Sequence, residues 1–318
     1  MSAPVVDVHA HYYDPAYVAL LRAAGLPALL ADDPLGGPAG LEQRLGMLDA
    51  AGIDVQLVSA GPLFPDVPDE DEAAHAAAVH NDGIAELADR TGGRLRGLGL
   101  LPLPHVAAAA AEVDRVAGLG LRGWSIGATI AGAPVSDPAF FPLFEALDAQ
   151  GALLLIHPVG NATRFYRSEL DLSWLLGSPV EDTAVAIDLA VSGWLERFPR
   201  IRVIVPHLGG VLPFISQRID DQYLRRNPFG TVAPSARVRP LWVDSVNSDP
   251  DALALTIRVL GLDRVLLGTD FPFLPGEMFT AAAGYLDDPR LAPGTAEAIR
   301  RDNPEALRVL DPNREETR

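Results

Sequence analysis

Eight short apolar runs recur along the chain, separated by longer stretches in which apolar residues return at helical spacing. Runs rich in Val, Ile and Leu that are bounded by turn-forming residues predict β-strands. The expected strands span residues 5–11, 54–61, 94–103, 121–129, 152–159, 201–210, 241–246 and 264–273.

The stretches between these runs predict helices. Helical spacing is evident at residues 40–52, 69–90, 137–151 and 182–198, and the Ala-rich tract 105–118 is a good helix former. Several of these stretches begin at Asp or Ser and end at Gly or Pro, as capped helices do.

Strands that alternate with helices predict a parallel sheet, and eight such units are the number that closes a (β/α)₈ TIM barrel. An open doubly wound sheet is the alternative, but the first strand-to-helix connection has no glycine-rich phosphate loop. A length of 318 residues is compatible with one barrel. We therefore expect an α/β fold, a single domain over residues 1–318, with short loop insertions at the C-terminal face of the barrel.

Charge and hydropathy narrow the possible partners. The formal net charge is −17 and the pI is near 4.7, which argues against nucleic acid or an anionic membrane, because both call for basic patches. No apolar run approaches the roughly 18 residues of a membrane span. The first residues also lack the basic and apolar segments of a secretory signal. A small anionic substrate is compatible with this composition, and we expect a cytoplasmic protein.

Two residue types are absent. Without Cys the chain has no disulfide, no thiolate metal ligand and no Cys nucleophile. All 25 Lys and Arg positions are Arg, so no lysine is present for a Schiff base, for covalently held pyridoxal phosphate or for a Walker-type phosphate site. The missing lysine also excludes a carboxylated lysine that bridges two metals.

The first expected strand, VVDVHAH, carries an unusual polar face. Alternate side chains of a strand point to opposite faces, so Asp7, His9 and His11 share one face while Val6 and Val8 share the other. Buried polar groups cost free energy unless they are hydrogen-bonded or bind something. This face is either the wet side of an edge strand or part of a site. Asp7, which lies deeper, either orients a ligand or is a buried polar residue near the barrel floor.

Three later strands finish in residues that can do chemistry. LLLI finishes in His157, VIVP in His207 and VLLGT in Asp270. Active-site groups of a barrel lie where strands end at the C-terminal face, so these side chains would meet the histidines of the first strand there. One such residue alone is more often structural, but five in the same topological position predict a shared site.

Neutral imidazoles and a carboxylate are ligands of Zn²⁺ and similar divalent ions. His9 and His11 can reach one ion from the same side. His157 and Asp270 can complete the set while leaving a position for water or substrate. His207 is then left as a general acid or base beside the metal, since a free imidazole titrates near neutrality.

An ordered series of motifs resembles the amidohydrolase superfamily, specifically the branch typified by aminocarboxymuconate semialdehyde decarboxylase. The HxH pair alone is weak evidence, whereas the order of the whole series is specific. The series covers nearly the whole chain: VDVHAH, MLDAAGIDVQLVS, IHPVG, WLLGSPVEDTAVA, LERFPRIRVIVPHLGGVLPF, LLGTDFPF and NPEAL. The resemblance implies a TIM barrel in which one metal, usually zinc, is held by His9, His11, His157 and Asp270 and in which His207 serves catalysis.

The resemblance also bears on the number of metals and on assembly. In superfamily members with two metals, a carboxylated lysine at the end of the fourth strand commonly bridges them. Residues 121–129 contain neither lysine nor a carboxylate, so we expect a single divalent ion, Zn²⁺ with Mn²⁺ as the alternative. A homodimer is expected from the same resemblance.

Two reaction types are implied. Many members of the branch remove CO₂ non-oxidatively from an aromatic or enal carboxylate, and His207 or Asp270 would protonate the carbon that CO₂ leaves. Others hydrolyse or hydrate related acids, amides or lactones, and the same residues would then act on a metal-activated water. We favour a decarboxylase of a small aromatic or muconate-type acid, with a hydrolase or hydratase as the alternative. A barrel that only binds a metal is a third possibility, against which the presence of both His207 and Asp270 argues.

Substrate contacts are expected from the loop after the fifth strand. Arg164, Arg167 and Trp174 offer charge and aromatic surface for a planar acid. A surface loop with scattered Arg residues is the alternative interpretation.

Arg218 is a further candidate for substrate binding, because relatives often carry an Arg in the helix that follows the HLGG turn. A salt bridge to Asp220 or Asp221 is the alternative. The decarboxylase that typifies the branch often has a His before the Asp-Pro that follows the seventh strand. This chain has Ser248 there, so its substrate is expected to differ.

The remaining histidines are weaker candidates. His75 and His80 lie five residues apart in a helical stretch, do not share a face well and are expected to be solvated. His105 is expected at the surface of a loop. Gly209 and Gly210 are expected either to let the backbone approach the site closely or to make a tight turn.

Overall fold

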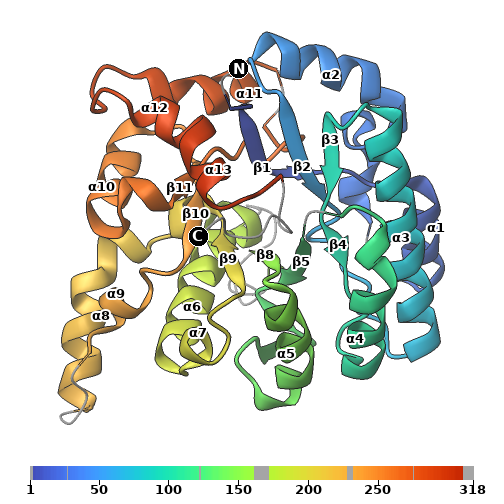
Figure 1. Ribbon diagram of the computed structural model, residues 1–318, viewed down its shortest axis with the longest axis horizontal. Coiled ribbons are helices and arrows are strands. Elements are labelled where there is room, and N and C mark those ends of the chain that lie inside the picture. Colours follow the sequence, from blue (N-terminus) through green and yellow to red (C-terminus); the bar gives the residue numbers. More distant parts are fainter. Residues whose placement is uncertain are drawn as a thin grey trace, which may run out of the picture.

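Parallel strands form a central ring that helices surround (Figure 1), which is the (β/α)₈ barrel that the alternation predicted. The computed structural model describes residues 3–26, 28–121, 123–160, 172–227, 232–274 and 276–310. In order around the ring, the strands are β1 (Val6–His11), β2 (Val55–Ser59), β3 (Leu95–Gly97) with β4 (Gly99–Leu100), β5 (Trp124–Gly127), β8 (Leu153–His157), β9 (Arg202–Val205), β10 (Trp242–Asp244) and β11 (Val265–Leu266). A short hairpin, β6 (Thr129–Ile130) and β7 (Ala133–Pro134), follows β5.

The ring closes between its first and last strands. β1 pairs with β2 on one side, and two isolated bridges, Asp7 with Leu267 and Ala10 with Phe271, join it to the segment after β11 on the other. β3 and β4 are separated by Leu98 alone and follow one another in the ring. The colours of Figure 1 accordingly run once around the ring and bring the two ends of the barrel together.

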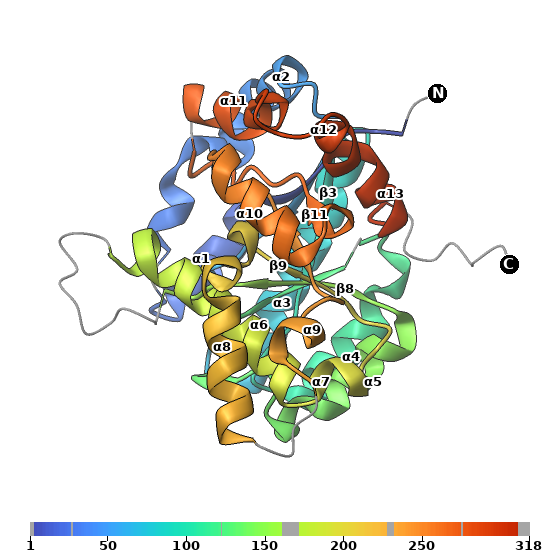
Figure 2. The same cartoon turned by 90° about the vertical axis from the view of Figure 1, so that its left-hand side faces the viewer.

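Helices cover the outside of the ring, and in Figure 2 α6, α8 and α10 lie in front of the strands. Asp14, Asp69 and Asp249 cap α1, α3 and α10, because each carboxylate accepts a hydrogen bond from a backbone N–H of the first turn. The helices are α1 (Pro15–Ala23), α2 (Leu41–Ala50), α3 (Glu70–Arg90), α4 (Val106–Arg115), α5 (Phe141–Gln150), α6 (Ser178–Val191), α7 (Trp194–Arg197), α8 (Leu212–Arg226), α9 (Pro234–Arg237), α10 (Pro250–Leu260), α11 (Glu277–Gly284), α12 (Thr295–Glu297) and α13 (Asn303–Ala306).

Alternate strand residues belong to two apolar layers. Leu154 and Ile156 of β8 pack in the large cluster that includes helix residues such as Phe144, so they face the outside of the ring. Leu153 and Leu155 belong to a separate cluster of strand residues in the barrel interior, with Val6, Val8, Leu57, Leu98, Ile204, Trp242 and Leu266. The interior series of β8 ends in His157, which places that imidazole at the C-terminal end of the barrel.

Several elements differ from the sequence prediction. The strand expected at 201–210 ends at Val205, because the chain turns at His207. The one expected at 264–273 ends at Leu266, and beyond it isolated bridges at Leu267 and Phe271 join the chain to β1. The helix expected at 182–198 begins earlier, at Ser178, and is interrupted near Gly193, whose φ is 83°. No helix among the described residues is long and apolar enough to cross a membrane.

The solvated position expected for His80 is wrong. His75 is exposed on α3 as expected, but His80 lies on the buried face of the same helix, with its ring 5.1 Å from that of Tyr17. Five residues are about 1.4 helical turns, so the two histidines point to different sides of the helix. His105 is half-buried before α4, and its Nε2 lies 3.0 Å from the carbonyl oxygen of Val67.

Candidate active site

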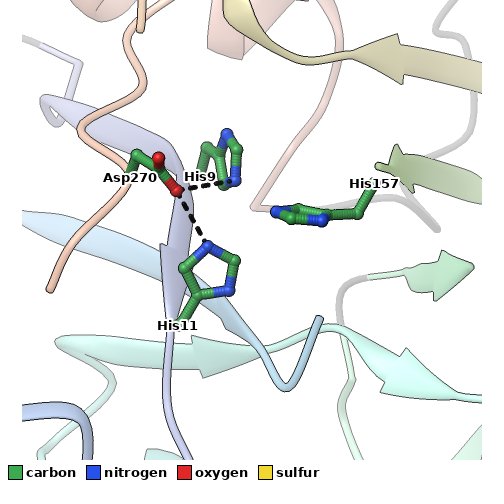
Figure 3. A group of neighbouring side chains, drawn as sticks. All are labelled: His9, His11, His157 and Asp270. Carbon is green, nitrogen blue, oxygen red and sulfur yellow. Dashed lines mark hydrogen bonds and ion pairs between the residues drawn. The ribbon is translucent and has the colours of Figure 1, made fainter. Parts of the chain in front are cut away.

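Four side chains converge at the C-terminal end of the barrel interior. His9, His11, His157 and Asp270 each offer one ligand atom, and these atoms all lie within 4.8 Å of one another. Figure 3 shows His157 pointing from β8 toward the two imidazoles of β1, with Asp270 on the opposite side of the group. All three imidazoles are buried. We call these residues the group of four; the structure brings them together, and their role as metal ligands is taken up below as a proposal.

The register of β1 against β2 changes after Asp7, so the strict alternation expected for this strand is interrupted near its two histidines. His9 and His11 both reach the group of four. Asp7 has other partners, because its Oδ2 accepts hydrogen bonds from the side chains of Gln56 and Thr269, each at 2.6 Å. Its Oδ1 accepts hydrogen bonds from the backbone N–H groups of His9 and Thr269, each at 3.1 Å, so Asp7 is a buried polar residue that also holds the backbone of one candidate ligand.

Two of the imidazoles are held so that one nitrogen is free. The Nδ1 of His9 lies 2.7 Å from Oδ2 of Asp244, and the Nδ1 of His157 lies 2.8 Å from the carbonyl oxygen of Pro158. Both acceptors require the hydrogen on Nδ1, so Nε2 carries the lone pair of the neutral ring. Both Nε2 atoms are buried and have no hydrogen-bond partner within the described part of the chain, and that of His9 lies 3.3 Å from Oδ1 of Asp270. Orphaned imidazole nitrogens next to a carboxylate fit a divalent cation.

Asp270 supplies the negative charge of the group. Its Oδ1 lies 3.0 Å from Nε2 of His11 and 3.3 Å from Nε2 of His9. Burial would raise the pKa of this carboxyl group, but His9, His11 and His207 hold it well below its usual range. Its backbone has a φ of 57°, in the left-handed region, and its N–H donates to the carbonyl oxygen of His9. The turn after β11 therefore aims Asp270 back at β1.

Burial keeps two of the rings neutral, which is the form that binds metal. It lowers the pKa of His11 to about 4, and it lowers the pKa of His157 well below the usual value. His9 differs: burial would lower its pKa, but the carboxylates of Asp244 and Asp270 raise it. The negative potential that favours a proton on His9 equally favours a metal cation at this place.

His207 lies beside the group of four. Its Nδ1 is 2.8 Å from Oδ2 of Asp182, and its Nε2 is 3.7 Å from Oδ2 of Asp270. Burial would lower the pKa of this imidazole, but the two carboxylates raise it well above its usual value. The backbone N–H of His207 donates to Oδ1 of Asp244 at 2.8 Å. The ring is therefore oriented from both sides, with Nε2 toward the group.

The turn after β9 needs its glycines. His207 and Leu208 have φ values of 53° and 58°, and Gly209 and Gly210 follow with 75° and 66°. A side chain at Gly210 would also collide with the carbonyl oxygen of Pro179. The tight turn is therefore present, and the close approach that the glycines allow is to α6 rather than to the group of four.

Two carboxylates that orient the histidines were missed in the sequence. Asp182 lies within α6, where it looks like any polar helix residue. Asp244 is the last residue of β10 and is fully buried. A carboxylate at the end of the seventh strand, in LWVDSV, was the signal that could have found Asp244, since the other site residues were recognised by the same position.

A buried polar network that the sequence did not reveal holds β1 through hydrogen bonds. The guanidinium of Arg44 donates to the carbonyl oxygen of His11 at 2.7 Å and to Oε1 of Gln56 at 2.9 Å. Gln56 in turn donates to Asp7. Arg44 also lies over the ring of Phe271, 4.5 Å from its centroid. This chain of contacts ties the backbone of one histidine to the two strands on either side of it.

Comparisons with known proteins agree with this arrangement. Residues 6–307 match the family model described as Amidohydrolase. The chain belongs to this amidohydrolase family. It is 32% identical over 241 residues to the 2-amino-3-carboxymuconate-6-semialdehyde decarboxylase of Dictyostelium discoideum, which covers 74% of this chain and 67% of that protein. The resemblance predicted from the motifs is confirmed.

A bacterial relative and a solved structure give the same result. The γ-resorcylate decarboxylase of Rhodococcus jostii (strain RHA1) is 30% identical over 298 residues, covering 84% of this chain and 87% of that protein. The crystal structure of 5-carboxyvanillate decarboxylase LigW from Sphingomonas paucimobilis matches with a TM-score of 0.82 at 26% identity, over 97% of this chain and 99% of that one.

The substrate-binding residues predicted for this amidohydrolase have different outcomes. Trp174 packs on Gly160 and lines a pocket next to His157. Arg164 and Arg167 lie outside the described residues. Arg218 is exposed on α8, and no contact among the described residues brings it to the group of four.

The alternative ion pair of Arg218 is not formed among the described residues either. Asp220 accepts a hydrogen bond from Ser235, at 2.6 Å, and Asp221 accepts one from Gln217, at 2.9 Å. The side chain of Arg218 is left at the surface of the amidohydrolase barrel.

Proposed function

We propose that this amidohydrolase is a metal-dependent, non-oxidative decarboxylase of a small aromatic or muconate-type carboxylic acid. The observation that carries the proposal is the place of His207, which is paired with Asp182 and lies beside the group of four rather than within it. Replacing CO₂ by hydrogen needs a proton donor next to the place that holds the carboxylate. The relatives named above are decarboxylases, which supports the same reaction.

One divalent cation would be held by His9, His11, His157 and Asp270, with Zn²⁺ as the expected ion and Mn²⁺ as the alternative. Three imidazoles and one carboxylate suit either ion. When bound, the cation supplies positive charge that anchors the substrate's carboxylate or an adjacent oxygen and offsets the negative charge that develops in the reaction. A group with one carboxylate offers too few anionic ligands to offset the repulsion of two cations, so we propose a single ion.

His207 supplies the proton in this scheme. When the bond to the carboxylate carbon breaks, its electron pair stays on the substrate carbon and CO₂ leaves. The proton on Nε2 of His207 then moves to that carbon, and water restores it for the next turnover. Asp182 stabilises the protonated ring through Nδ1, and Asp270 faces Nε2 and orients it. We therefore propose His207 and Asp270 as the catalytic pair.

We propose substrate contacts from Arg164, Arg167, Trp174 and Arg218. Of these residues, Trp174 has structural support, because its ring lies against Gly160, three residues after His157. A homodimer and a cytoplasmic location are further predictions.

The reaction is tested by incubating the purified protein with a panel of aromatic and muconate-type acids in D₂O. We expect CO₂ release and one deuterium at the carbon that carried the carboxylate. His207→Asn should release no CO₂ above background. Turnover of lactone or amide analogues by the wild-type protein without CO₂ release would support the hydrolase alternative and overturn the proposal.

The single metal is tested by titrating chelator-treated protein with Zn²⁺ and with Mn²⁺. Activity should saturate at about one equivalent, because only one group of ligands is proposed. Two tightly bound ions that are both required would contradict the single-ion site and would favour hydrolysis.

A further inference from the structure

An apolar pocket of about 420 Å³ lies on the side of the barrel where β5 pairs with β8, and its lining residue Gly127 is the pairing partner of His157. Its wall comes from the end of α1, from the loops after β2 and β4, and from β5 with its hairpin. The main apolar side chains in this wall are Leu26, Leu63, Phe64, Leu103, Ile130 and Trp174.

His157 is the member of the group of four that adjoins the pocket wall. Gly61 precedes the pocket residue Pro62, and a Cβ added to it would lie 3.3 Å from Cγ of His157. Gly127 lines the pocket and pairs in register with His157. The Nε2 edge of the same ring faces the group of four. The pocket and the group of four therefore lie on two sides of the same residue, His157.

The pocket suits hydrocarbon and is larger than a single ring requires. An apolar cavity of about 150 Å³ holds a benzene molecule. Asp66 is the only charged side chain among the described lining residues, and it is exposed. A charged substituent would lose its hydration in this wall without gaining a partner, whereas an apolar one gains from leaving water.

One polar group of the pocket wall has no partner. Ser125 pairs in register with Leu155, a residue of the interior layer, and its Oγ is buried without a hydrogen bond within the described part of the chain. A buried hydroxyl is costly when it stays unpaired. An oxygen of a bound molecule would complete this hydrogen bond.

We propose that the pocket binds an apolar extension of the substrate, an alkyl or alkenyl chain of several carbons or a second ring, and that Ser125 hydrogen-bonds one oxygen of the same molecule. The inference rests on the proposed decarboxylation and specifies its substrate class. The preferred acid carries a bulky hydrophobic substituent. Acids of one ring with only small polar substituents leave the pocket empty.

The pocket is tested first without turnover, using alkylphenols whose chains have one to five carbons. Binding is followed by calorimetry, in the metal-loaded protein and after chelation. The dissociation constant should fall about fourfold for each added methylene, equally in both preparations, because the pocket contains no ligand of the group of four. A dissociation constant that does not change with chain length would overturn the proposal.

Two variants fill the pocket. Leu103→Trp and Leu26→Trp each replace a half-buried leucine of the wall, and either one, once shown to be folded by circular dichroism, should abolish the dependence on chain length. Leu224→Trp, on the surface of α8, is the matched control and should leave it unchanged. Pocket variants that bind the pentyl compound as tightly as the wild type would contradict the assignment.

Ser125→Ala tests the hydrogen bond separately. It should raise the dissociation constant of every phenol of the series about fivefold and leave the change per methylene unaltered. An unaltered series would remove Ser125 from the proposal.

Activity separates this inference from the reaction itself. Salicylates with the same chains should lose CO₂ with a kcat/KM that rises with chain length. Binding that tightens with chain length, with no CO₂ from any compound, would leave the pocket in place and overturn the decarboxylase. CO₂ release at a rate that does not change with chain length would support the decarboxylase and overturn the proposed pocket.

Discussion

The C-terminal face of the barrel has two halves of opposite chemistry. At the ends of β1, β9, β10 and β11, polar side chains hold one another: Asp244 fixes His9, and Asp182 fixes His207. Around β5 and the loops after β2 and β4, the pocket wall consists mainly of apolar side chains, and the Oγ of Ser125 within it is buried without a hydrogen bond in the described part of the chain. His157 lies at the boundary.

The difference indicates that separate parts of the same barrel serve the chemical step and the choice of substrate. In the polar half each group depends on a specific partner, because an unpaired buried charge or hydrogen bond is costly. In the apolar half binding depends on shape and area, so several residues share the effect. Changes in the first half should alter metal content and turnover, whereas changes in the second should alter which molecule binds.

The largest effect is expected from His157→Ala. This change removes one of the proposed ligands and leaves the other imidazoles without the group that closes the site from β8. Metal content by mass spectrometry should drop from about one ion per chain to almost none, with activity lost in parallel. His75→Ala, at an exposed histidine, is the control. Full metal content in His157→Ala would disprove its assignment as a ligand.

His207→Ala should distinguish the residues of the polar half that bind the metal from the residue that transfers the proton. Because His207 is proposed to lie outside the ligand set, the variant should keep its metal while kcat falls about 100- to 10,000-fold, the usual contribution of a general acid. The measurement combines metal analysis with the rate of CO₂ release. If the metal were lost as well, His207 would be a ligand and the proton donor would have to be sought elsewhere.

Asp244→Asn should weaken the site more mildly. The amide keeps the size of the side chain but loses the charge that holds Nδ1 of His9. Loss of such a partner typically costs about 10- to 100-fold in metal affinity. Competition with a chelator measures the change, and Asp263→Asn, at an exposed carboxylate, is the control. Equal affinities in both variants would show that His9 needs no help from β10.

The smallest effect concerns His80, a buried histidine that lies away from the group of four. The pKa of an ordinary histidine is 6.5, and burial lowers that of His80 to about 4. Between these values the unfolded chain binds a proton that the folded chain does not, so stability falls as the pH drops from 6.5 toward 4. The difference in free energy of unfolding between His80→Phe and the wild type should therefore be about 2 kcal/mol more in favour of the variant at pH 5 than at pH 7. Urea unfolding at the two pH values measures this; parallel pH profiles would contradict it.

The two halves were not equally predictable from the sequence. His9, His11, His157 and Asp270 stand out because each is a polar residue at the end of an apolar run, and strand ends meet in a barrel. Asp182 has no such context, since it is one of three consecutive polar residues, 181–183, near the start of a helix. The network of Arg44 and Gln56 depends on contacts between remote elements, which no local pattern encodes.

The pocket was invisible for a different reason. Leu26, Leu63 and Leu103 are ordinary residues of three separate loops, and only the fold makes them neighbours. Trp174 was noticed as an aromatic residue but could not be assigned to a wall. The prediction for His80 failed because the position of His75 and His80 on different faces of α3 was taken as evidence that both are exposed. A helix that packs on a barrel buries one of its faces, and His80 lies on that face.

The closing seam of the barrel has a consequence for how the protein is made. His11 and Asp270, which are 3.0 Å apart in the folded molecule, are separated by 259 positions in the chain. During translation the two histidines of β1 emerge from the ribosome early, whereas the carboxylate of Asp270 is synthesised near the end of the chain. A nascent or truncated chain thus carries only a fragment of the proposed cation site, and we expect the capacity to retain an ion to arrive together with the last strand. Tight metal retention would in this way distinguish finished molecules from incomplete ones in the cell.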